Sequence, residues 1–212
     1  LLRLYGADGQ LDRRRYADLV DQGVTIGCSW LERSLPAFAN LASEATTAFG
    51  GIVNCAFIAS FGSSTGYPVH YDCEDLLLLQ VAGRKRWRLY GPSVPGSGFM
   101  REVLPPAGEP SQILEMQPGD VLFVPSGLRH VCEPIESSLH VGINIRWPTA
   151  LWLLRALLRK ASEDPGLTEP LRPFASEERL QTREAALRQR LQGLLEQTSV
   201  KQLWDEFRRG LG

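Results

Sequence analysis

Short apolar runs separated by turn residues fill the middle of the chain, from residue 52 to residue 147. Eight runs have the β-branched and aromatic content of strands: IVNCAFIAS, YPVHYD, LLLLQVA, RWRLY, SQILEM, DVLFVPS, RHVCEP and SLHVGINIRW. The segments between them, such as GSSTG, PPAGEP and QPGD, contain glycine and proline, which are unsuited to a central strand. This spacing of short strands and turns predicts a jelly roll or a barrel.

Helical periodicity replaces this pattern on both sides of the predicted barrel. Two N-terminal segments, DRRRYADLVDQG and LPAFANLASEATTAFG, carry apolar residues at helical spacing and end on glycine. Near the C-terminus one helical stripe is formed by Leu180, Leu187, Leu191 and Leu194. The segment SVKQ, from Ser199, has the pattern of a capping box at the start of a further helix. We therefore expect an N-terminal helical flank (1–50), a barrel domain (51–148) and a C-terminal helical region (149–212).

The composition is that of an ordinary globular protein, because 43% of the 212 residues are apolar and 22% are charged. The formal net charge is −1 and no block of like charges occurs, so we expect no direct nucleic-acid partner. The longest apolar runs fall short of the roughly 18 to 20 residues that span a bilayer. Neither a membrane span nor a signal-peptide pattern is present, and the four cysteines are far apart, which favours a cytoplasmic protein with reduced thiols. Because the sequence begins at Leu1 without a methionine, a missing upstream segment is a further expectation.

The chain has three histidines, so any imidazole-based site draws on His70, His130 and His140. His70 and Asp72 lie two positions apart at the start of a predicted strand, where alternation turns both side chains to the same face. A turn at PSG delivers His130 at the start of a later strand. Two histidines and one carboxylate form the facial triad that is typical of non-haem Fe(II) sites. The alternative, that these are ordinary polar residues of the surface or core, stays open at this point.

Two longer segments carry a resemblance to a known family. HYDCEDLLLLQVAGRKRWRLYGP opens with H-x-D, continues through an apolar strand to glutamine, and closes on a glycine and a basic strand that contains tryptophan. QPGDVLFVPSGLRH, followed by SLHVGI, contains the later histidine. In these features and in their order the chain resembles the JmjC-type 2-oxoglutarate oxygenases, and among them most the ribosomal oxygenases. The resemblance covers residues 52–147, with weaker similarity in the flanking helices.

The resemblance implies a mainly β protein with a double-stranded β-helix (jelly-roll or cupin) core, flanking N-terminal helices and a C-terminal helical region. It implies that His70, Asp72 and His130 are catalytic ligands of Fe(II), and that 2-oxoglutarate and O2 are cosubstrates. It also implies that Lys85, fifteen positions after His70, pairs with the far carboxylate of 2-oxoglutarate.

The physical reason for a cation at Lys85 is that a carboxylate buried without a partner is costly. Three arginines surround Lys85 in GRKRWR and compete for this role. Strand alternation places Lys85 and Trp87 on one face and the arginines on the other, so only one of these sets can face inward. A solvated basic strand fits the arginines better than it fits Lys85.

Four further residues bear on the expected site. Tyr67 is a candidate cosubstrate contact at the mouth of the barrel, and Asn144 is another because related asparaginyl hydroxylases carry an asparagine near the cosubstrate. His140 is interpreted as a residue of the barrel wall rather than as a metal ligand. Cys55 stands where the resemblance leads us to expect an asparagine.

The implied function is hydroxylation of a C–H bond, with a protein or peptide side chain as the favoured substrate. Alternatives are a hydroxylase of small molecules or natural products, a non-catalytic cupin binding protein, and a metal-dependent cupin that needs no 2-oxoglutarate. The H-x-D pattern counts against the last, because such cupins generally present H-x-H. The ribosomal oxygenases dimerise through helices after the barrel, so we expect a homodimer formed through residues 151–212.

Overall fold

The computed structural model of the chain describes residues 10–62, 65–92, 102–103, 108–170 and 176–209. The chain divides into two compact units, Leu1–Arg146 and Trp147–Gly212. Among the described residues, no helix is both long enough and apolar enough to cross a membrane.

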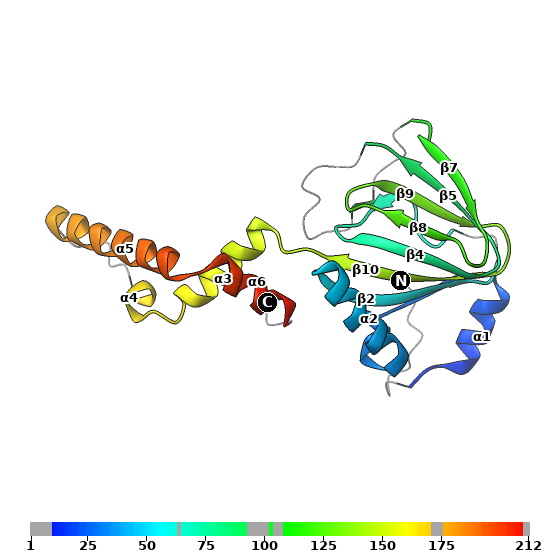
Figure 1. The fold of residues 1–212 in the computed structure, drawn as a ribbon, viewed down its shortest axis with the longest axis horizontal. Coiled ribbons are helices and arrows are strands. Elements are labelled where there is room, and N and C mark those ends of the chain that lie inside the picture. Colours follow the sequence, from blue (N-terminus) through cyan, green and yellow to red (C-terminus); the bar gives the residue numbers. More distant parts are fainter. Residues whose placement is uncertain (1–9, 63–64, 93–101, 104–107, 171–175, 210–212) are drawn as a thin grey trace. The chain divides into compact units, whose positions relative to one another are not determined.

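Two five-stranded antiparallel sheets face each other in the first unit (Figure 1). One sheet has the order β1 (Thr25–Ser29), β2 (Ile52–Ser60), β10 (Ser138–Arg146), β4 (Asp75–Ala82) and β8 (Val121–Val124). The other has the order β6 (Glu102–Val103), β3 (His70–Tyr71), β9 (Arg129–Pro134), β5 (Lys85–Tyr90) and β7 (Gln112–Met116). The non-sequential strand orders are those of a double-stranded β-helix, and the predicted fold class is confirmed.

Alternation along these strands separates the interior of the barrel from its outside. On β5 the side chains of Lys85 and Trp87 are buried, with 1% and 3% of their surface exposed, whereas Arg86 and Arg88 are partly exposed. The inward-facing apolar residues form a core between the sheets, made of Leu76, Leu78, Trp87, Met116 and Val124. The predicted alternation of β5 is therefore confirmed.

The turn between β4 and β5 fixes the register of β5. Gly83 has φ 61°, and a Cβ atom added to it would lie 2.1 Å from the backbone oxygen of Ser137. Only glycine suits a positive φ and such a close approach of two backbones. This turn places Lys85 two residues further on, at the start of β5.

Helices and one unexpected strand complete the N-terminal part of the first unit. The helices are α1 (Arg13–Asp21), the short 3-10 helix η1 (Leu31–Arg33) and α2 (Pro36–Phe49). α2 packs against β2 and β10, where Cys55 and Ile145 meet Ala42 and Ala45 (Figure 1). The sequence predicts a mainly helical segment over residues 1–50, and β1 departs from this prediction because it pairs with β2 along its whole length.

The second unit consists of helices α3 (Ala150–Ala161), α4 (Pro165–Thr168), α5 (Glu177–Gln197) and α6 (Val200–Arg208). Trp152 of α3 packs edge-on against Phe207 of α6, with ring centroids 4.9 Å apart. The predicted capping box at the start of α6 is present, because Ser199 and Gln202 exchange side-chain and backbone hydrogen bonds. The predicted stripe of α5 is half-buried at Leu187 and Leu194 and exposed at Leu180 and Leu191.

Candidate functional site

The structure brings together the three residues proposed from the H-x-D pattern and the later histidine. His70 of β3 and His130 of β9 are direct partners in the antiparallel register, and their ring centroids are 4.5 Å apart. Asp72 follows β3, and its Oδ2 lies 3.7 Å from Nε2 of His70 and 3.5 Å from Nε2 of His130. All three side chains are buried, and one potential ligand atom from each lies within 4.8 Å of the others.

Backbone carbonyls fix the orientation of both imidazoles. Nδ1 of His70 lies 2.8 Å from the oxygen of Pro68, and Nδ1 of His130 lies 2.8 Å from the oxygen of Leu128. A carbonyl can only accept, so each Nδ1 donates, and in the neutral form of the ring the lone pair of Nε2 faces Asp72. Two imidazole lone pairs and a carboxylate thus converge in a buried place, and a divalent cation among them would satisfy all three. The residues therefore fit a non-haem metal ion.

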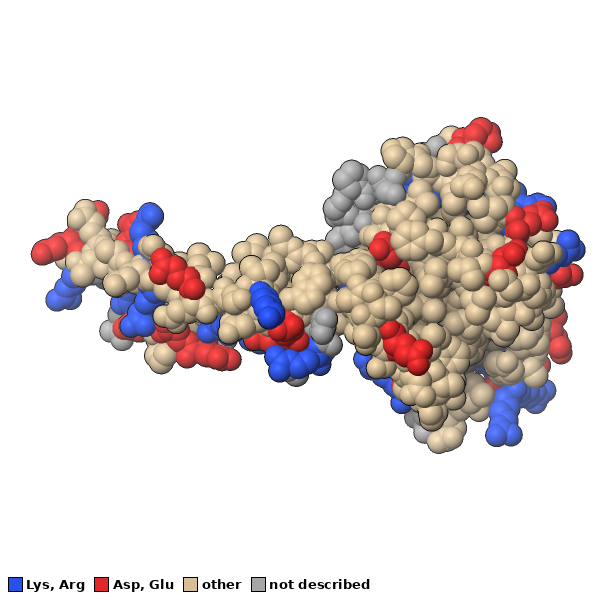
Figure 2. Space-filling view, in the orientation of Figure 1, with Lys and Arg blue, Asp and Glu red and all other residues tan. Residues whose placement is uncertain are grey.

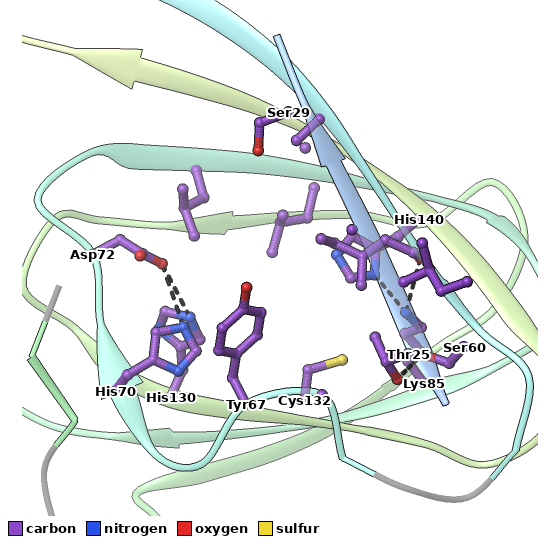
Figure 3. A pocket seen from close by; sticks show the side chains of 18 of the residues that line it. Thr25, Ser29, Ser60, Tyr67, His70, Asp72, Lys85, His130, Cys132 and His140 are labelled. Carbon is purple, nitrogen blue, oxygen red and sulfur yellow. Dashed lines mark hydrogen bonds and ion pairs between the residues drawn. The ribbon is translucent and has the colours of Figure 1, made fainter. Parts of the chain in front are cut away.

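A cavity of about 630 Å³ extends from this cluster between the two sheets. In Figure 3 the cluster lies at one end, and Lys85 and His140 lie at the other with Thr25 and Ser60. Such a volume lies within the range of about 300 to 1,000 Å³ that is common for small-molecule sites. The cavity thus joins a candidate metal centre to a buried cation.

Lys85 is the buried cation, and the arginines of the same strand point away from the cavity. Its Nζ donates to the backbone oxygen of Ile58 at 3.2 Å and contacts Nδ1 of His140 at 2.9 Å. Burial lowers the pKa of Lys85 to about 8, because removal from water disfavours the ammonium form. Arg86 and Arg88 instead form ion pairs at the surface, with Glu115 and Glu133 respectively.

The two further candidate cosubstrate contacts, Tyr67 and Asn144, also line the cavity. Figure 3 shows the hydroxyl of Tyr67 directed into the cavity between its two ends, and the ring of Tyr67 lies 5.5 Å from that of His70. Asn144 of β10 lines the cavity as well, and its Nδ2 donates to Oδ1 of Asn54 at 2.9 Å. The role of either residue in cosubstrate binding stays a prediction.

The sequence has an asparagine, Asn54, directly before Cys55 on β2. The Cys55 side chain packs under α2 on the outside of the sheet, whereas Asn54 is buried opposite Asn144 on the inner face. Asn54 was not proposed from the sequence, and burial gives no signal for it because residues 53–56 of β2 are all buried. A shift of one residue in a strand reverses which face each side chain occupies.

Three other lining residues were not proposed from the sequence. Thr25 and Ser29 come from β1, and Thr25 Oγ1 donates to Ser60 Oγ at 2.9 Å. Cys132 lies two residues beyond His130 on the same inward face of β9, and burial raises the pKa of its thiol to about 12. This thiol stays protonated at neutral pH, so it contributes a small apolar wall rather than a charged ligand.

Comparison with known proteins decides the family. The profile of the JmjC domain matches residues 37–153, which is more than half of the chain. The chain belongs to the JmjC domain family. Residues 70, 72, 85 and 130 all lie inside the matched segment of this JmjC chain, whereas β1 lies outside it.

Curated relatives of this JmjC chain include ribosomal oxygenase 2 of Rattus norvegicus, which is 36% identical over 100 residues, or 45% of this chain and 22% of the relative. Another is the bifunctional lysine-specific demethylase and histidyl-hydroxylase NO66 of Drosophila willistoni, 33% identical over 118 residues, or 52% of this chain and 15% of the relative. The matched regions thus make up about a fifth or less of the length of these two relatives.

Solved structures include the ribosomal oxygenase YcfD of Escherichia coli in complex with cobalt and 2-oxoglutarate. It matches with a TM-score of 0.60 at 19% identity, over 87% of this chain and 50% of that chain. At this identity the likeness supports the fold of the JmjC chain.

Proposed function

We propose that this chain is an Fe(II)- and 2-oxoglutarate-dependent oxygenase that hydroxylates a C–H bond on a protein or peptide side chain. The observation that carries the proposal is the placement of a buried two-histidine, one-carboxylate cluster and a buried lysine at the two ends of one cavity. The fold and the family membership support it. When bound at such a cluster, a ferrous ion supplies the redox chemistry that couples O2 and 2-oxoglutarate to succinate, CO2 and a hydroxylated product.

Different residues of the chain would bind the metal and the cosubstrate. His70, Asp72 and His130 would hold the metal from one side and leave the cavity side open for 2-oxoglutarate and O2. Lys85 would pair with the far carboxylate, in a place where an unpaired carboxylate would be costly. Tyr67 and Asn144 would contact the cosubstrate from the walls.

The charges of these groups match a dianionic cosubstrate. A divalent ion, the negative Asp72 and the positive Lys85 together leave two positive charges, which equal the two negative charges of 2-oxoglutarate. The other carboxylate at the cavity, Glu74, forms an ion pair with Arg146 and adds no net charge. The filled site is therefore neutral, as a buried site requires.

A protein substrate is favoured by the relatives. Ribosomal oxygenase 2 and the histidyl-hydroxylase NO66 are named for action on ribosomes and on histidyl residues. We propose no direct nucleic-acid partner, because basic and acidic side chains are interspersed over the helices of the second unit on the face that Figure 2 shows. A cytoplasmic location, in keeping with four free cysteines, belongs to the same proposal.

We also propose that the chain forms a homodimer through residues 151–212. Leu151, Leu154 and Leu158 lie at helical spacing on α3 and are 49%, 56% and 70% exposed. On α5, Leu191 and Leu195 are 48% and 59% exposed. Apolar stripes of this kind are normally covered, and a second copy of the helical unit would cover them.

Succinate formation tests the catalytic proposal directly. Protein loaded anaerobically with Fe(II) and 2-oxoglutarate is mixed with O2 and with fractionated cellular protein or with small-molecule extract. Stimulation of succinate release by a protein fraction is expected. Absence of 2-oxoglutarate turnover with every fraction would reject the proposed oxygenase activity. Stimulation by the small-molecule extract alone would show that the substrate is a small molecule rather than a protein or peptide.

A further inference from the structure

The ammonium of Lys85 is held by two acceptors from the opposite sheet. Lys85 belongs to β5, whereas Ile58 and His140 belong to β2 and β10 of the other sheet. Ile58 and His140 are themselves partners in the antiparallel register, so one cross-strand pair supplies both contacts. In the part of the chain that the structure describes, these are the hydrogen-bond partners of Nζ, at 3.2 and 2.9 Å. An ammonium has three N–H bonds, so one donor is left for a ligand.

His140 can act only as an acceptor toward a charged lysine. An ammonium has donors and no acceptor, so Nδ1 of His140 must accept and the neutral ring must carry its proton on Nε2. Burial first, and then the charge of Lys85, lower the pKa of His140 to about 3. The imidazole therefore stays neutral at physiological pH and adds no charge that would oppose binding of an anion.

Packing fixes the plane of the His140 ring. The ring is buried, with 5% of the residue exposed, and lies edge-on to Trp87 with centroids 5.5 Å apart. Trp87 in turn lies 5.7 Å from the ring of His130, so the indole separates His140 from the metal cluster. His140 therefore lies at the lysine end of the cavity, away from the metal ligands (Figure 3).

We propose that His140 is a positioning residue that holds Lys85 so that its remaining N–H points at the far carboxylate of the cosubstrate. The inference rests on the proposed function, and it assigns His140 to cosubstrate affinity rather than to the metal. Without the acceptor, the long lysine side chain can adopt other rotamers, and each binding event must then order it again. The competing interpretation is a buried histidine that serves packing alone.

Two substitutions at His140 separate these interpretations. His140→Leu introduces an apolar side chain of similar size and removes the acceptor, whereas His140→Asn places an amide oxygen, which can accept, near the position of Nδ1. Calorimetry on the Co(II)-loaded protein measures the Kd for 2-oxoglutarate. His140→Leu should raise this Kd about tenfold, which is the effect of losing one hydrogen bond to a charged group. His140→Asn should restore most of the affinity. Both variants should keep the wild-type cobalt content, and at saturating 2-oxoglutarate kcat should stay within about twofold.

A double-mutant cycle tests whether His140 acts through Lys85. In the Lys85→Met background, His140→Leu should weaken binding by less than about twofold, because the group that it positions is absent. An equal loss in both backgrounds, or wild-type affinity in His140→Leu, would overturn the inference while leaving the oxygenase proposal intact. Failure of the wild-type protein to bind 2-oxoglutarate would overturn both.

A measurement on the metal-free protein tests the contact without any ligand. With three histidines, ¹⁵N-labelled imidazole signals can be assigned by substitution. His140 should show one protonated and one acceptor nitrogen, with no titration between pH 5 and 8, roughly the window in which an unperturbed histidine titrates. Protonation of His140 near pH 6.5, or a proton on Nδ1, would overturn the proposed hydrogen bond even if every variant folds poorly.

Discussion

Replacement of Lys85 by alanine should separate cosubstrate binding from metal binding. The side chain of Lys85 is 1% exposed, so a carboxylate that reaches it is removed from water and depends on the ammonium for its partner. Breaking one half of such a buried pair costs about 3 to 5 kcal/mol, which raises the KM for 2-oxoglutarate roughly a hundredfold or more. The metal ligands lie at the other end of the cavity, so the iron content should not change (Figure 3).

Arg86→Ala is the matched control, because it removes a positive charge from the next position of the same strand. The Arg86 side chain points outward and is 40% exposed in its ion pair with Glu115. Such a surface pair has little influence on a buried site. The assay is the 2-oxoglutarate dependence of succinate release for both variants, together with metal analysis. A larger effect for Arg86→Ala than for Lys85→Ala would refute the inward assignment of Lys85.

Three further predictions follow from the same structure. The KM for 2-oxoglutarate should rise as pH increases through about 8, because the pKa of Lys85 is lowered to about 8 and Lys85 of the free protein loses its charge above that pH. Initial rates between pH 6.5 and 9.5, roughly 1.5 units either side of this pKa, measure the KM. A KM that does not change with pH would contradict the prediction. Lys85→Met should stabilise the ligand-free protein by about 1 to 3 kcal/mol at pH 7, because below the lowered pKa the buried lysine is charged in the folded state and the full cost of burying that charge is present. A lower denaturation midpoint for Lys85→Met than for the wild type would argue against this. Light scattering should show a dimer for the intact chain and a monomer for residues 1–147, and a monomeric intact chain at micromolar concentration would reject the homodimer.

Most strands of the barrel could be predicted because their signals are local. Alternating side chains and glycine- or proline-rich turns delimit β2, β4, β5, β9 and β10 in the sequence, and the structure has strands at these places. The strand β1 was missed because TIGCS is a short run between two helical segments. It becomes a strand through pairing with β2, which the local pattern does not encode.

The candidate site was predictable only in part for the same reason. The H-x-D pattern and the turn before His130 lie within short segments, and strand alternation placed Lys85 on the inner face. The contact between Lys85 and His140 joins residues 55 positions apart, and it depends on how the two sheets face each other. Asn54 and Cys55 are neighbours on β2, so alternation turns their side chains to opposite faces, and Cys55 packs under α2.

The central claim is that His70, Asp72 and His130 hold one ferrous ion that also binds 2-oxoglutarate. The most direct measurement is the iron content of anaerobically loaded wild-type, Asp72→Ala and His130→Ala proteins, with the charge-transfer absorption that appears when 2-oxoglutarate chelates Fe(II). Folding of each variant is checked by circular dichroism. The wild type should bind one iron per chain and develop the absorption band, and both variants should lose the iron and the band while remaining folded. Full iron occupancy in His130→Ala would contradict the account.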